Sequence, residues 1–91
     1  MLKAWGRFSH DGVRDALGSL RRRLRRTGRY RFGSSGDGEL TIKGAELTAY
    51  ARKYRVKDGW RVALCRGSRR IEDEQIDGIE TVAAFIKKRV H

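Results

Sequence analysis

The fold of this chain is decided by the stretch RKYRVKDGWRVAL, residues 52–64. Apolar and basic side chains alternate on both sides of its centre, which is typical of two antiparallel strands. The centre, residues 57–59, reads Lys-Asp-Gly and predicts a three-residue hairpin loop, because glycine readily takes the left-handed conformation that ends such a loop. A loop of this length places Val56 opposite Trp60.

The register of this predicted hairpin determines which side chains share a face. With a three-residue loop, Tyr54 faces Val62 and Arg52 faces Leu64, so that one face is nearly all apolar. The opposite, outward face then carries Lys53, Arg55, Arg61, Ala63 and Cys65. A two-residue loop would mix basic with apolar side chains, since a slip of one residue exchanges the two faces. We therefore expect the three-residue loop, which leaves only Arg52 unexplained on the apolar face.

The segment before the hairpin, residues 46–56, fits two interpretations. Its apolar residues fall at helical spacing over Leu47–Tyr54 and at strand spacing toward Val56. Because the hairpin needs a first strand, we expect strand here. The alternative is an all-helical or winged helix-turn-helix protein, with a helix over Glu46–Tyr54 and a recognition helix or wing over Trp60–Arg70.

A helix is predicted on each side of this central region. Before it, one apolar stripe recurs at intervals of three and four residues, formed by Val13, Ala16, Leu17, Leu20 and Leu24. Gly28 follows as the residue that ends this helix. After it, a second stripe is formed by Ile79, Val82, Ala83, Ile86 and Val90. Asp77 and Glu80 are spaced as the two members of a capping box at the start of the second helix.

Three more short strands complete the expected fold. Residues 29–32 place Tyr30 and Phe32 inward, residues 40–43 alternate in the same way, and residues 69–73 turn back beside the hairpin with Ile71 inward. We expect an α+β fold: an N-terminal helix, an antiparallel β-meander of four to five short strands, and a C-terminal helix. Both helices should pack on one face of the sheet.

The chain is short enough for a single domain over residues 1–91, with residues 1–9 as an arm beside it. The expected core draws on both helices and on the second strand of the hairpin. Its members are Leu17, Leu20, Leu24, Val62, Leu64, Val82 and Ile86.

Positive charge is concentrated in one part of the sequence. The chain has 22 Lys and Arg against 11 Asp and Glu, a net charge of +11. Residues 21–31 alone contain seven arginines, and residues 1–33 contain ten basic and two acidic residues. A basic segment attached to a nearly balanced one is typical of a binding surface on a scaffold. Its commonest partner is the phosphate backbone of a nucleic acid.

The candidate contacts lie on the first helix, the strand that follows it and the outward face of the hairpin. They are Arg14, Arg21, Arg22, Arg25, Arg26, Arg29, Arg31, Lys53, Arg55 and Arg61. Guanidinium groups bind phosphate oxygens bidentately, which suits this composition. Stacking of bases on the sheet is not expected, because the predicted register turns most aromatic side chains toward the core.

Several other kinds of chemistry find no support in the sequence. One cysteine, Cys65, and two histidines, His10 and His91, do not make a usual zinc site or a catalytic pair. The protein is therefore expected not to be an enzyme and to need no cofactor. A single cysteine also fits a reducing cytoplasm, and no apolar run reaches the length of a membrane-spanning helix.

The sequence therefore predicts a DNA-binding or RNA-binding protein. The alternative is a small protein-binding regulatory module or inhibitor, of the kind that a phage or plasmid encodes, docking on an acidic protein partner. A third reading is an anionic-membrane binder that uses Leu2, Trp5, Phe8 and the basic helix.

Overall fold

The computed structural model describes residues 10–34, 38–54 and 59–91. The elements are helix α2 (His10–Arg25), strands β1 (Arg31–Ser34), β2 (Glu39–Lys43), β3 (Thr48–Lys53), β4 (Gly59–Arg66) and β5 (Arg69–Asp77), and helix α3 (Ile79–Arg89). The predicted arm at residues 1–9 and the predicted contact Arg55 lie outside the described residues.

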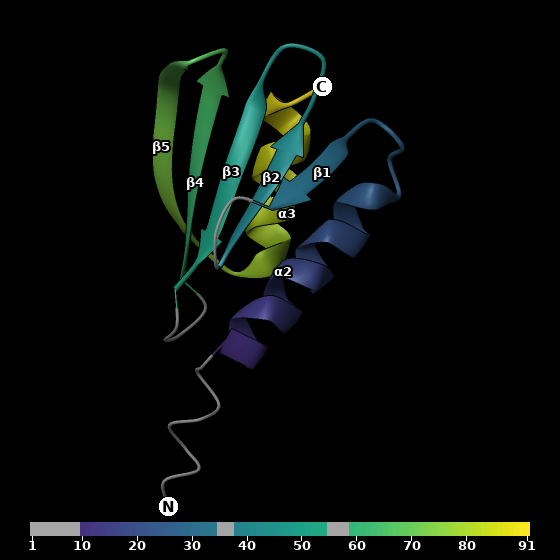
Figure 1. Ribbon diagram of the computed structural model, residues 1–91, viewed down its shortest axis with the longest axis vertical. Helices are drawn as coiled ribbons and strands as arrows, with labels where there is room; N and C mark the ends of the chain where they lie inside the picture. Colours follow the sequence, from purple (N-terminus) through teal and green to yellow (C-terminus); the bar gives the residue numbers. More distant parts are fainter. Residues whose placement is uncertain (1–9, 35–37, 55–58) are drawn as a thin grey trace, which may run out of the picture.

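The five strands form one antiparallel sheet in the order in which they occur in the chain, β1-β2-β3-β4-β5 (Figure 1). The predicted α+β fold is thus confirmed, and the sheet has five of the expected four to five strands. The helical alternative is wrong, since strand β3 occupies residues 48–53, where that alternative requires a helix.

Both helices cover the same face of the sheet and close the core between them. Leu20 and Leu24 of α2 and Val82 and Ile86 of α3 are fully buried in one cluster with the inward side chains of the sheet. Those inward side chains are Leu40, Ile42, Ala49, Ala51, Trp60, Val62 and Leu64. The predicted core is confirmed, except that Leu17 is only partly buried at its margin. Small alanines on β3 let the helices approach the centre of the sheet.

The register between β3 and β4 differs from the predicted one. Trp60 pairs with Lys53, and Val62 pairs with Ala51. The predicted pairs Val56–Trp60 and Tyr54–Val62 are therefore wrong; Tyr54 instead closes the hairpin, donating from its backbone N–H to the carbonyl of Gly59 at 3.0 Å. The shift of three residues exchanges the faces of β3.

This exchange accounts for the arginine that the predicted register left unexplained. Arg52 pairs with Arg61, and both are exposed on the face of the sheet opposite the helices, which we call the open face. Lys53, predicted to point outward, lies instead on the helix-covered side, with its Nζ 6.0 Å from the centre of the Trp60 ring. The lysine covers the edge of the core with its alkyl chain and donates from Nζ to the carbonyl of Tyr54 at 2.8 Å.

The last strand and the start of α3 also differ from expectation. Strand β5 continues to Asp77, and its register with β4 shifts between Leu64 and Cys65, which leaves Ile71 unpaired. Ile71 is 44% exposed, so its predicted inward position is wrong. The predicted capping box is also wrong: Gly78, at φ +90°, precedes α3 without a side-chain cap.

The end of the chain is fastened to the sheet and to the segment before β1. Val90 is fully buried, the Tyr30 hydroxyl donates to its carbonyl at 2.8 Å, and the Ala45 N–H donates to the His91 carbonyl at 2.8 Å. A Cβ on Gly44 would lie 2.6 Å from that His91 oxygen. Glycine at this position is therefore what allows the two segments to meet.

Candidate functional site

Seven arginines on and after α2 extend into solvent. They are Arg14, Arg21, Arg22, Arg25, Arg26, Arg29 and Arg31, all of which were predicted as contacts. We call this set the α2 surface. Within the described part of the chain, none of the seven forms an ion pair with an acidic side chain. No acidic side chain of the described residues therefore pairs with their charge.

The cations of the α2 surface lie on both flanks of the helix. On one flank, the Arg21 guanidinium lies over the ring of Phe32 on β1, 5.5 Å from its centre. Helical geometry places Arg14 and Arg25 on the same flank. On the other flank, Arg22 and Arg26 line a groove between α2 and α3. The C-terminal half of the helix thus presents positive charge on both of its flanks.

The groove between the helices has a volume of about 480 Å³ and adds a further cation. Its far wall is formed by α3, where Ala83 and Ala84 leave it open and exposed Lys87 contributes its ammonium group. Glu80 is the one acidic residue in its lining. An anion in this groove would meet more positive than negative charge.

Arg23 is the member of the arginine run that has an acidic partner. Its Nε and Nη2 donate to Oε2 of Glu80 on α3 at 3.1 and 2.8 Å, and its Nη1 donates to Ser19 at 2.9 Å. The Arg23 guanidinium lowers the pKa of the Glu80 carboxyl below its usual value. Arg23 therefore joins the two helices and does not belong to the exposed, unpaired arginines of the α2 surface.

Arginines later in the chain are bound differently. Six of them are described beyond residue 31, and five of the six have an acidic partner within 4 Å. The pairs are Arg52–Glu39, Arg61–Asp73, Arg66–Glu46, Arg70–Asp73 and Arg89–Glu72; Arg69 is the exception within the described ranges. The acidic cluster at residues 72–74 thus supplies partners for arginines of the sheet and of α3.

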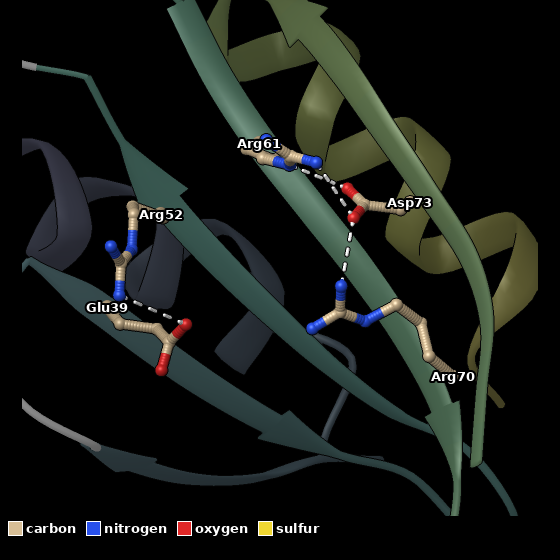
Figure 2. A network of polar contacts seen from close by, with 5 residues as sticks. All are labelled: Glu39, Arg52, Arg61, Arg70 and Asp73. Atoms are coloured by element: carbon tan, nitrogen blue, oxygen red, sulfur yellow. Dashed lines mark hydrogen bonds and ion pairs between the residues drawn. The ribbon is translucent and has the colours of Figure 1, made fainter.

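The open face carries the densest of these contacts. Figure 2 shows Arg61 and Arg70 converging on Asp73, with the two helices behind the sheet. Arg61 donates from Nε and Nη2 to the two carboxylate oxygens at 2.8 and 3.0 Å, and Arg70 donates to one of them at 3.2 Å. Hydrogen bonding by Arg61 lowers the pKa of Asp73, and Asp73 in turn raises the pKa of Arg61.

The predicted contacts therefore do not form one continuous surface. Arg61 stands on the open face, across the sheet from α2, and Lys53 lies on the helix-covered side. Six of the seven residues of the α2 surface remain together because they share one helix and the turn after it, whereas Arg31 begins β1 and alternates there with the core-packed Phe32. The basic surface was expected to continue from α2 onto the outward face of the hairpin. That expectation depended on the predicted hairpin register, which is wrong.

Two aromatic side chains on the open face were missed by the sequence reasoning. Tyr50 and Tyr54 are half-buried and line a hollow of about 440 Å³ together with Arg52, Arg61, Ala63 and Arg70. Their four-residue spacing and alternation with Ala51 and Lys53 agree with this placement, but the predicted hairpin register turned Tyr54 toward the core. The sheet therefore does carry aromatic rings outside the core.

The described residues contain no group of three His, Cys, Asp or Glu side chains arranged to hold a metal ion. In the same residues, no helix is long and apolar enough to cross a membrane. No family model matches the chain, and comparisons with curated proteins and with solved structures gave no match either.

Proposed function

We propose that the protein binds nucleic acid through the α2 surface, which contacts the phosphate backbone. One contrast carries this proposal. Of the eight described arginines up to Arg31, only Arg23 has an acidic partner, whereas five of the six described arginines beyond it are paired. Within the described ranges, acidic side chains pair with Arg23 and with five of the six later arginines, but with none of the α2 surface, whose charge we take to be available for an external anion.

Physical chemistry favours a polyanion as that partner. Like charges one helical turn apart repel each other, so the second half of α2 is held against its own repulsion by the burial of Leu20 and Leu24. A phosphate backbone relieves this repulsion and releases its condensed counterions when arginines replace them. Each guanidinium can also donate two parallel hydrogen bonds to one phosphate.

The arrangement of the cations favours duplex DNA within this class. A helix fits the major groove of B-form DNA, and basic side chains on both of its flanks can then reach the two backbones that border the groove. Arg21 and Arg22 mark these two flanks. The deep, narrow major groove of A-form RNA does not admit a helix in this way. RNA therefore serves as the comparison ligand.

Two charge-matched variants test the proposal. The first, Arg22→Gln/Arg25→Gln/Arg26→Gln, removes three charges from the α2 surface. The control, Arg66→Gln/Arg69→Gln/Arg89→Gln, removes the same charge from the two ends of the β4–β5 turn and from the end of α3. Fluorescence anisotropy with duplex DNA and duplex RNA of equal length measures the affinity of each protein, and circular dichroism verifies that both variants fold.

We expect the first variant to lose duplex affinity by at least about tenfold more than the control, because three phosphate contacts are removed instead of general charge. Equal losses would show that only net charge matters and would overturn the proposal. An α2-surface variant that keeps full affinity for DNA and RNA, yet no longer binds one acidic protein, would favour the protein-binding alternative instead.

A further inference from the structure

The open face of the sheet combines aromatic rings with arginines that are held in place. No described element covers this face, since both helices pack on the opposite one. Tyr50 lies opposite Ala63, a side chain too small to hide the ring. The Tyr54 ring lies against Gly59, where an added Cβ would come within 2.8 Å of its Cδ2. Two rings are thus placed along β3 beside small neighbours.

The arginines of this face keep hydrogen-bond donors available. Arg61 is bound to Asp73 through Nε and Nη2 and also hydrogen-bonds Tyr54, so the available donors belong to the other two arginines. Arg70 donates only from Nη1 to Asp73, and Arg52 lies 3.9 Å from Glu39, beyond hydrogen-bonding distance (Figure 2). The carboxylates therefore orient the guanidinium groups at the hollow without using all of their donors, and the arginines outnumber the carboxylates there three to two.

We infer that the open face binds an unpaired stretch of nucleic acid, with bases stacked on Tyr50 and Tyr54 and phosphates bound by Arg52 and Arg70. Stacking requires a free base face, which only a single strand offers, whereas guanidinium groups suit the phosphates on either side. The hollow of about 440 Å³ is in the size range of sites that take one small organic group, such as a nucleobase.

This inference rests on the proposed function only in taking nucleic acid as the ligand, because the two sites lie on opposite faces of the protein. The α2 surface contacts phosphates and is proposed to favour duplex DNA. The open face would contact the faces of unpaired bases and would therefore select single strands. Substitutions on the α2 surface should therefore weaken duplex binding, whereas substitutions on the open face should weaken single-strand binding.

The test compares three labelled probes of about a dozen nucleotides: oligothymidine, a strand of the same length without bases, and a duplex. The stacking variant is Tyr50→Leu/Tyr54→Leu, and its matched control is Tyr50→Phe/Tyr54→Phe, which keeps both rings. A second variant, Ala63→Glu, places a negative charge in the hollow and leaves the tyrosines intact.

We expect the leucine variant to weaken oligothymidine binding by about fivefold to a hundredfold for each of the two stacked bases. The phenylalanine control should bind nearly as the parent does, and Ala63→Glu should weaken the same probe. Affinity for the baseless strand and for the duplex should stay unchanged in the leucine variant, which also shows that it folds.

Oligothymidine affinity that is the same in the leucine variant and the parent would overturn the inference. An equal loss on the baseless strand would also overturn it, since stacking cannot explain such a loss. Failure of the proposed function appears separately: the Arg22→Gln/Arg25→Gln/Arg26→Gln variant would then keep its duplex affinity while the leucine variant still loses oligothymidine.

Discussion

Arg23 and Glu80 join the two helices across the groove that faces away from the sheet, with the Arg23 Nη2 2.8 Å from the Glu80 Oε2. Arg23 pairs with an acidic residue of α3, whereas its neighbours Arg22 and Arg26 line the same groove and stay exposed. The pair therefore divides the basic helix into one structural arginine and a set that is free to bind. The division is a property of the tertiary fold, because Arg22 and Arg23 are adjacent and chemically identical.

Acid should destabilise the protein through the carboxylates that arginines hold. Both Glu80 and Asp73 have pKa values below their ordinary 4.5 and 3.8, because Arg23 and Arg61 donate hydrogen bonds to them. A lowered pKa in the folded state gives stability that is present above the unfolded-state pKa and is lost as the pH falls through the folded value. We expect the urea midpoint to decline below about pH 4.5.

The variant Glu80→Gln/Asp73→Asn measures this contribution directly. It should be less stable than the parent near neutral pH and should show a shallower decline toward acid, so that the two profiles converge. Parallel profiles from neutral to acidic pH would mean that these two pairs contribute nothing to the acid dependence.

Leu20 tests the packing of α2 on the sheet. Its side chain is fully buried between the helices and the inward face. Leu20→Ala should lower the free energy of unfolding by about 2–5 kcal/mol, through lost burial and a cavity. The control Ile71→Ala removes an apolar side chain that is 44% exposed and should cost much less. A cost for Leu20→Ala below about 1 kcal/mol, measured by denaturant unfolding, would contradict the core described here.

Two glycine-to-alanine changes should have opposite effects. Gly18 lies inside α2, and a Cβ there meets only the Arg22 side chain at 3.7 Å, so Gly18→Ala should stabilise the protein by about 0.5–1 kcal/mol. Gly44→Ala forces a Cβ to within 2.6 Å of the His91 carbonyl oxygen and should destabilise by about 1–3 kcal/mol. Thermal unfolding of both variants gives the two signs, and a destabilising Gly18→Ala would mean that the middle of α2 is packed differently.

The sequence predicted the elements better than their pairing. The apolar stripes over Val13–Leu24 and Ile79–Val90 predicted both helices, because a period near 3.6 is hard to mistake over three turns. Gly28, at φ +69°, ends the first helix region as expected. These features depend on local spacing alone, which a single sequence contains.

The register of the central hairpin was not recoverable in the same way. The choice of a three-residue loop maximised large apolar side chains on one face, whereas the core takes Ala49 and Ala51 because helices approach there. Small residues give a weak apolar signal, although close packing requires them. The register between β3 and β4 determines on which face Tyr50 and Tyr54 lie. A wrong register therefore hid the open-face site.

The salt dependence of duplex binding tests the central claim most directly, because it counts the phosphates that the α2 surface neutralises. If about five phosphates are contacted, log affinity against log salt concentration should have a slope of about −4 to −5 for the parent protein. The slope should flatten by about 2–3 in Arg22→Gln/Arg25→Gln/Arg26→Gln and change by less than about 1 in Arg66→Gln/Arg69→Gln/Arg89→Gln. Equal slopes for the parent and the α2 variant would contradict the account, since the unpaired arginines would then make no phosphate contacts.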